Sequence, residues 1–144
     1  MQNQGVMNEE TNKNVFAFFD ACETGKGWEV CKQYCTPDAT FSSQNDPLKD
    51  MKSLEVYVDW MKGLCTGIMK GCTYDLKSWT TNSSQAVAYA IFHGTHNGES
   101  GPCPTTNKST VSDYVYVMDV KDGKVSNLVK VWNSPWAFRE LGWC

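Results

Sequence analysis

The sequence predicts an α+β fold, with helices in the first half of the chain and a sheet in the second. Up to Gly71, apolar residues follow the i, i+3, i+4, i+7 spacing of amphipathic helices. After Gly71, β-branched and aromatic residues alternate with polar ones, as in half-buried strands. Asp122-Gly123 stands between two such alternating runs and indicates a hairpin. Helices followed by antiparallel strands are typical of helices packed on one face of a curved sheet.

Three helices are expected before the sheet, at residues 15–22, 28–35 and 54–68, with a short extended segment at 39–42. The first ends at Gly25, and the second stops before Pro37. The third is introduced by Pro47 and Asp50 and has the strongest periodicity, because seven apolar residues fall on one stripe. A helix with such a stripe must pack against another layer.

The sheet is expected to contain strands at residues 74–80, 85–95, 111–120 and 124–133, followed by a short helix or turn at 135–141. A two-residue turn at Asp122-Gly123 sets Lys121 opposite Lys124, and the register follows by counting outward. This count places Tyr114, Tyr116 and Asn133 on the face expected to line a pocket. The same count places Asp113, Lys130 and Trp132 on the other face.

Composition limits the class of protein. The chain has 144 residues and a formal net charge of −3, so we expect one domain over residues 1–144, with residues 1–8 as a loose leader, and no nucleic-acid partner. No apolar run approaches the roughly 18 residues of a membrane span, and the N-terminus lacks the pattern of an export signal. We therefore expect a cytoplasmic protein with no membrane partner and seven reduced cysteines. Cys31 and Cys35 have no second ligand pair nearby in sequence, so no metal site is expected.

Several short motifs give the chain a family resemblance from about Val15 to Trp143. They are Pro37-Asp38-Ala39-Thr40-Phe41, Gly94-Thr95-His96-Asn97-Gly98, Pro104-Thr105-Thr106-Asn107-Lys108, Asp122-Gly123-Lys124-Val125 and Leu141-Gly142-Trp143. In order and spacing the chain resembles the SnoaL-like polyketide cyclase branch of the nuclear-transport-factor-2-like superfamily. The resemblance implies a cone-shaped barrel, in which a strongly curved mixed or antiparallel sheet wraps around three N-terminal helices and encloses a pocket. It also implies a homodimer packed through the outer face of the sheet.

The resemblance also implies where catalysis would occur. In such cyclases an aspartate seven residues before the hairpin glycine acts as general base or acid, but here that position is Tyr116. A phenol is a poor base at neutral pH, although it can donate a hydrogen bond to a carbonyl or enolate oxygen. Another aspartate is common near the end of the last strand, where this chain has Asn133. Asp113 reaches the pocket only if a bulge shifts the register.

His96 is the remaining candidate for proton transfer, because imidazole titrates near neutrality and the residue lies in a matching motif. The alternative is that His96 holds its loop by a hydrogen bond. His93 is expected on the opposite face of the same strand, so the two histidines do not form one site.

Two functions are therefore open. The first is an enzyme that cyclises, isomerises or dehydrates a small apolar or aromatic carbonyl compound, with His96 moving the proton, Tyr116 stabilising the oxyanion and Asn133 orienting the substrate. The second is a non-catalytic module that binds an apolar ligand. Other residues expected to contact the ligand are Tyr114, Tyr57, Phe19, Trp28 and Asp113. No cofactor is expected, because the chain lacks phosphate-binding loops and nicotinamide fingerprints.

Overall fold

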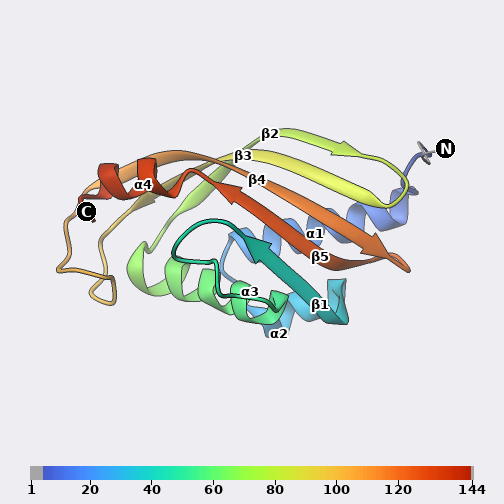
Figure 1. Cartoon of the computed structure of the whole chain (residues 1–144), viewed down its shortest axis with the longest axis horizontal. Helices are drawn as coiled ribbons and strands as arrows, with labels where there is room; N and C mark the ends of the chain where they lie inside the picture. The colour runs from blue at the N-terminus through green and yellow to red at the C-terminus, as the bar shows by residue number, and fades with distance from the viewer. Residues whose placement is uncertain (1–4, 144) are drawn as a thin grey trace.

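The computed structural model describes residues 5–143, which form four α-helices, two short helical turns and one five-stranded sheet (Figure 1). The helical elements are α1 (Glu9–Glu23), α2 (Trp28–Cys31), the 3₁₀ turn η1 (Lys32–Tyr34), α3 (Leu54–Gly63), the π-helical turn η2 (Leu64–Ile68) and α4 (Ser134–Leu141). The strands are β1 (Cys35–Ser43), β2 (Thr73–Thr81), β3 (Gln85–Thr95), β4 (Ser109–Lys121) and β5 (Lys124–Trp132). The α+β class is confirmed.

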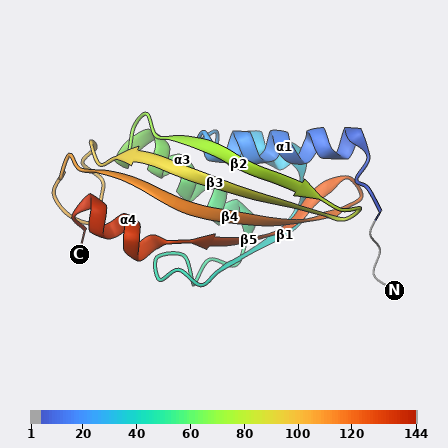
Figure 2. The same ribbon diagram turned by 90° about the horizontal axis from the view of Figure 1, so that it is seen from above.

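The sheet is mixed and open. Its strand order is β1-β5-β4-β3-β2, with β1 parallel to β5 and the other pairs antiparallel (Figure 2). Because β1 and β2 remain as edges, the sheet does not close into the cone-shaped barrel that the resemblance implied. The expected three N-terminal helices are α1, the single turn α2 and α3, and β1 intervenes before α3.

Helices α1 and α3 lie on the same face of the sheet and form the second layer (Figures 1 and 2). Asn8 caps α1 by accepting a hydrogen bond from Thr11 N, and Ser53 caps α3 by accepting one from Val56 N. At the end of α1, Gly25 has a φ of +74°, and a Cβ there would lie 2.6 Å from that of Cys65. Glycine therefore allows both the turn and the close approach of α1 to η2.

The core lies between this helical layer and the inner face of the sheet. Alternate residues of β3 and β4, including Ala88, Ala90 and Met118, are fully buried on that face. Met7 and Asn8 fell in the expected loose leader, but Met7 is buried and Asn8 is the cap of α1. Residues 1–4 of that leader lie outside the described residues. Within residues 5–143, no helix is both long and apolar enough to cross a membrane.

A β-bulge at Ser126 changes the register of β5. Lys121 does oppose Lys124, and Val120 opposes Val125, but Asp119 then opposes Asn127. One extra residue on β5 shifts every later pair, so Tyr116 opposes Lys130 and Tyr114 opposes Trp132.

The face assignments from a regular hairpin are therefore wrong beyond Ser126. Lys130 and Trp132 point to the inner face and are buried, whereas Asn133 is exposed beyond the end of β5. The bulge is held locally, because Ser126 Oγ donates to Asp119 O at 3.2 Å and Asn127 Nδ2 donates to Asp119 Oδ2 at 3.3 Å.

Candidate functional site

A cluster of polar side chains is buried between α1, α3 and the sheet. Glu23 is the last residue of α1 and 4% exposed, and Lys130 of β5 is 6% exposed. Three tyrosines complete this polar cluster: Tyr57 of α3, and Tyr114 and Tyr116 of β4. Ionisable groups are seldom buried to this extent unless they have hydrogen-bond partners, which offset the loss of hydration.

A chain of hydrogen bonds joins the lysine to the acid. Lys130 Nζ donates to Tyr57 Oη at 2.9 Å, the Tyr57 and Tyr116 hydroxyls are bonded to each other, and Tyr116 donates to Glu23 Oε2. Among the described residues, no ion pair within 4 Å joins Lys130 directly to Glu23. The two tyrosines therefore mediate between them, and a proton can pass from lysine to acid by one shift along each bond.

Burial shifts the two end groups in opposite directions. Loss of hydration raises the pKa of Glu23, which the charge of Lys130 and the two nearby tyrosine hydroxyls, those of Tyr114 and Tyr116, only partly oppose. The same loss lowers the pKa of Lys130, with the charge of Glu23 opposing it. Both shifts favour the neutral pair, a carboxylic acid and an amine.

Aromatic rings surround the Lys130 amine. Its Nζ lies 4.8–5.9 Å from five ring centroids, those of Tyr57, Trp60, Tyr114, Tyr116 and Trp132. Ring faces attract a cation by about 2 kcal/mol or more when desolvated, which supports some charge on Lys130. This attraction opposes the effect of burial on the amine.

Two hollows lie next to this cluster. The inner cavity, of about 10 Å³, is lined by Glu23, Met61, Leu64, Phe92, Tyr114, Lys130 and Trp132. The aromatic hollow, of about 270 Å³, is lined by Pro47, Trp60, Leu64, Ile68, Pro102, Trp132, Phe138 and Trp143. Leu64 and Trp132 line both, so they form the wall between the polar cluster and the aromatic hollow.

The Tyr114 hydroxyl is the free polar group of the inner cavity. Its oxygen is buried and has no hydrogen-bond partner among the described residues. Glu23 is close enough to influence the pKa of Tyr114, but no hydrogen bond of normal geometry joins them. A buried hydroxyl without a partner is costly, so it is a candidate for binding a ligand oxygen.

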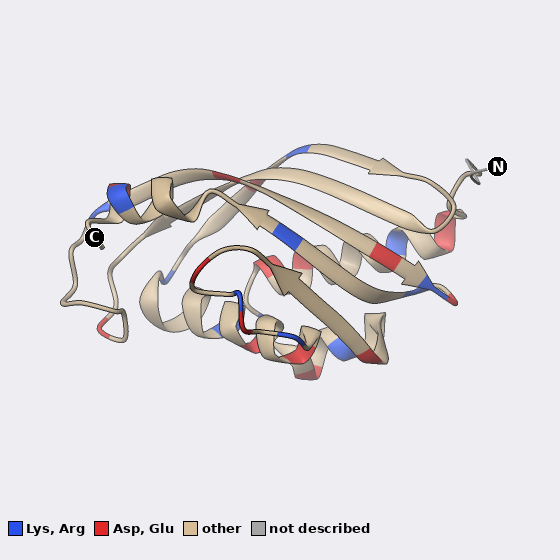
Figure 3. Cartoon of the chain, in the orientation of Figure 1, with Lys and Arg blue, Asp and Glu red and all other residues tan. Residues whose placement is uncertain are grey.

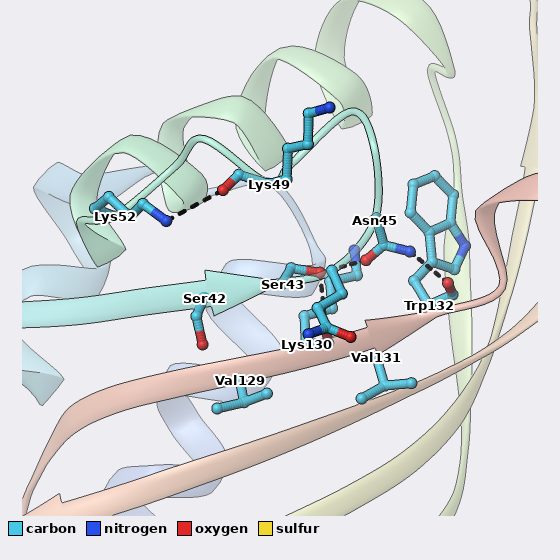
Figure 4. A pocket seen from close by; sticks show the side chains of 10 residues that line it. Ser42, Ser43, Asn45, Lys49, Lys52, Val129, Lys130, Val131 and Trp132 are labelled. Carbon is cyan, nitrogen blue, oxygen red and sulfur yellow. Dashed lines mark hydrogen bonds between the residues drawn. The ribbon is translucent and has the colours of Figure 1, made fainter.

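A larger groove of about 800 Å³ lies between the ends of β1 and β5 and the loop after β1 (Figure 4). Its buried polar groups are already paired: Ser43 Oγ donates to Lys130 O, and Asn45 Nδ2 donates to Trp132 O (Figure 4). Lys49 and Lys52 at its rim are exposed. The groove therefore offers less specific chemistry than the polar cluster.

The structure brings four of the predicted site residues together. Tyr57, Tyr114 and Tyr116 belong to the polar cluster, and the ring of Phe19 packs edge-on against Tyr116 with centroids 5.4 Å apart. Tyr116 is therefore correctly placed on the inner face, where it is hydrogen-bonded to the acid.

The other predicted contact residues lie elsewhere. Trp28 lines a separate surface hollow with Pro37 and Lys124. Asp113 remains on the outer face of the sheet, because the bulge is in β5 and leaves the alternation of β4 regular. Asn133 caps α4 by accepting a hydrogen bond from Trp136 N. Trp28, Asp113 and Asn133 do not line the inner cavity or the aromatic hollow.

His96 is buried but remote from Tyr116. Tyr116 opposes Ala88 of β3, and eight residues separate Ala88 from His96, which corresponds to about 25 Å of strand. His96 Nδ1 accepts from Trp143 Nε1 at 3.0 Å and from Thr106 N at 3.3 Å. These bonds join the loop after β3 to the segment after α4, which agrees with the alternative in which His96 holds its loop by a hydrogen bond. The combined action of His96 and Tyr116 on one substrate does not fit this geometry.

Sequence reasoning missed Glu23 and Lys130. Glu23 lies four residues after Phe19, on the apolar stripe of α1, and an acid at such a position was a usable signal. A regular register places Lys130 on the outer face, because no sequence pattern reveals the bulge. Within residues 5–143, no three His, Cys, Asp or Glu side chains are grouped so that they could hold a metal ion.

Comparisons with known proteins agree with this architecture. A family model described as a SnoaL-like domain matches residues 15–128. No curated protein matches the chain.

Solved structures with the same fold include a protein from Jannaschia sp. CCS1 named as a SnoaL-like polyketide cyclase. The identity is 15%, the TM-score 0.78, and the match covers 98% of this chain and 97% of that one. A polyketide cyclase by name from Acidithiobacillus ferrooxidans matches at 15% identity and a TM-score of 0.75, with 94% and 96% covered. An NTF2-like protein from Burkholderia xenovorans LB400 matches at 15% identity and a TM-score of 0.70, with 95% and 99% covered.

Proposed function

The chain belongs to the family of SnoaL-like domains, and from this premise we propose that it binds a small apolar or aromatic carbonyl compound and transfers a proton on it without a cofactor. The observation that carries the proposal is the inner cavity, where the acid Glu23 and the unpartnered hydroxyl of Tyr114 meet beneath the aromatic hollow. The chemical class of the reaction is cyclisation, isomerisation or dehydration.

The aromatic hollow supports an apolar ligand of one or two rings. Its volume of about 270 Å³ is just below the roughly 300–1,000 Å³ of drug-sized pockets. Trp60, Trp132, Phe138 and Trp143 provide ring surface, and Pro47 adds a further apolar wall. A carbonyl group on such a ligand would point toward the polar cluster, because the polar groups lie on that side.

The polar cluster supports the chemistry. Tyr114 donates a hydrogen bond to the carbonyl oxygen, which becomes stronger as that oxygen gains negative charge. Glu23 takes a proton from the carbon next to the carbonyl, or returns one to it. Its raised pKa brings the acid closer to neutrality, where general acids and bases are most effective. Tyr116 positions the carboxyl, so the proton transfer first predicted for His96 passes to Glu23.

The test is deuterium exchange into acetophenone in D₂O, followed by NMR, because exchange next to a carbonyl reports the proposed step without knowledge of the natural substrate. We expect the wild-type protein to accelerate exchange and Glu23→Gln to lower the acceleration at least about 100-fold. Glu29→Gln is the matched control, since the Glu29 side chain is 86% exposed. Equal exchange by both variants would exclude Glu23 as the proton carrier.

The second candidate function is a non-catalytic binding module. The small volume of the inner cavity, about 10 Å³, favours it, because a ligand would rest in the aromatic hollow without reaching Glu23. The same experiment separates the two: thermal stabilisation by acetophenone without any exchange supports the binding module.

We further propose a homodimer packed through the outer face of the sheet. Val111 and Val131 on this face are 52% and 60% exposed, and β3 has no charged residue. Figure 3 shows that charged positions are few on the strands. An exposed apolar sheet face of this kind supports a subunit interface. We also propose that residues 1–144 form one domain. We propose a cytoplasmic location, which the six free cysteines among the described residues support.

A further inference from the structure

Lys130 has an environment that the proton-transfer proposal does not require. Its side chain is buried, and its amine donates one hydrogen bond, to Tyr57, and otherwise faces aromatic rings. An amine held for ionic reasons alone would be expected against a carboxylate, whereas Glu23 is reached only through two tyrosines. Buried lysines in apolar surroundings are the ones that act as nucleophiles toward carbonyl groups.

We infer that Lys130 forms a Schiff base with the carbonyl carbon of the ligand. The inference rests on the proposed function, because it takes the ligand to be a carbonyl compound held in the aromatic hollow. It adds a covalent role for a residue that borders the inner cavity beside Glu23 and Tyr114.

The groups needed for this reaction are present. The lone pair of Nζ attacks the carbonyl carbon, and the carbonyl oxygen takes a proton from Glu23, through Tyr114 or directly. Nζ then loses its extra proton to the Glu23 carboxylate, which returns it to the hydroxyl group as that group leaves as water. As the C=N bond forms, the second Nζ proton passes through Tyr57 and Tyr116 to Glu23, which is thereby restored to the acid form. One amine and one carbonyl therefore give one imine and one water, with no oxidant or reductant.

The amine must be neutral to attack. Burial lowers the pKa of Lys130, and the hydrogen-bond chain gives its proton a route to Glu23. At pH 7 an ordinary lysine is neutral in roughly one molecule in 2,500, so a buried one has a large advantage over surface lysines.

The path to Lys130 passes Leu64 and Trp132. These two side chains line both the aromatic hollow and the inner cavity. The inner cavity is at most just large enough for one water molecule, so one of the two side chains must turn aside to admit the carbonyl carbon. The Trp132 ring centroid lies 4.8 Å from Nζ, so a turn of this ring directly exposes the amine to the hollow.

The experiment is reductive trapping of the full chain with benzaldehyde and sodium cyanoborohydride at pH 7, followed by intact mass measurement and peptide mapping. Benzaldehyde has one ring and no hydrogen on the carbon next to its carbonyl, so trapping is independent of proton exchange. We expect a mass increase of one benzaldehyde, less one water, plus two hydrogens. We expect the label on Lys130 to exceed that on Lys124 at least tenfold. Lys130→Met should abolish this excess labelling, whereas Lys124→Met should leave it unchanged.

Each outcome decides something. Benzaldehyde that raises the melting temperature but labels all lysines alike overturns the inference and leaves the proposed function standing. Selective capture by Lys130, together with no exchange into acetophenone, supports the inference and overturns the proton transfer. Absence of any binding by aromatic carbonyl compounds overturns both. Peptide mapping of the wild-type chain keeps the test valid even if Lys130→Met fails to fold.

Discussion

Tyr114→Phe removes a single oxygen from the inner cavity and should raise stability while weakening ligand binding. The Tyr114 hydroxyl is buried without a hydrogen-bond partner among the described residues. The folded protein therefore bears the desolvation penalty of this group, about 1–3 kcal/mol, which phenylalanine does not. With a typical m value of about 2 kcal/mol/M, the urea midpoint should rise by about 0.5–1.5 M.

Tyr57→Phe is the matched control, because it removes the same atom from a neighbouring ring with opposite consequences. Tyr57 accepts the hydrogen bond of Lys130 Nζ and is bonded to Tyr116. Its loss leaves the amine without an acceptor and should lower the free energy of unfolding by about 2–4 kcal/mol.

Urea denaturation followed by tryptophan fluorescence measures both variants, and binding of acetophenone measures the functional effect. Tyr114→Phe should bind about three- to tenfold more weakly, which corresponds to one lost neutral hydrogen bond. The reasoning is refuted if Tyr114→Phe is destabilised as much as Tyr57→Phe, since the hydroxyl would then have a structural partner.

Three further predictions follow from the same contacts. Because burial raises the pKa of Glu23 in the folded state, the stability that its bound proton contributes is lost as pH rises above the ordinary value of 4.5. In urea titrations at increasing pH, the folding constant of the wild type should therefore fall relative to that of Glu23→Gln, by up to about tenfold per pH unit, and parallel curves contradict this. His96→Ala should destabilise by about 2–4 kcal/mol and raise KM without lowering kcat, because His96 holds Trp143 of the aromatic hollow. Val131→Lys should convert a dimer to a monomer in sedimentation equilibrium, whereas the similarly exposed Val56→Lys on α3 should not.

The elements of the fold were predictable from local patterns. The stripe of α1 and the alternation of β3 and β4 are set by which residues must be buried, and these periods are read directly from the chain. Gly25 and Gly123 mark turns that need a positive φ. The third helix begins at Leu54, as its apolar stripe predicts, but its cap is Ser53, and the loop that carries Pro47 and Asp50 bonds to β1.

The site was less predictable because it depends on contacts between distant segments. Glu23 and Lys130 are 107 positions apart in the sequence and come together only because α1 packs against β5. The aromatic hollow combines the third helical region with the loop after β3 and the segment after α4. No local sequence pattern shows that these distant segments are in contact. The position of Tyr116 was an exception, because it follows from the hairpin alone.

The bulge at Ser126 has a consequence for how this chain is aligned and engineered. A single-residue insertion or deletion between Val125 and Leu128 would exchange interior and exterior for the rest of β5. An insertion would place Val129 and Val131 where Lys130 and Trp132 now stand, and a deletion would place Val131 and Asn133 there. Residues of relatives should therefore be matched to this strand separately on the two sides of Ser126. A redesign of the pocket that keeps the length of this segment preserves which positions of β5 face the pocket, whereas a change of one residue in length replaces the chemistry of the pocket.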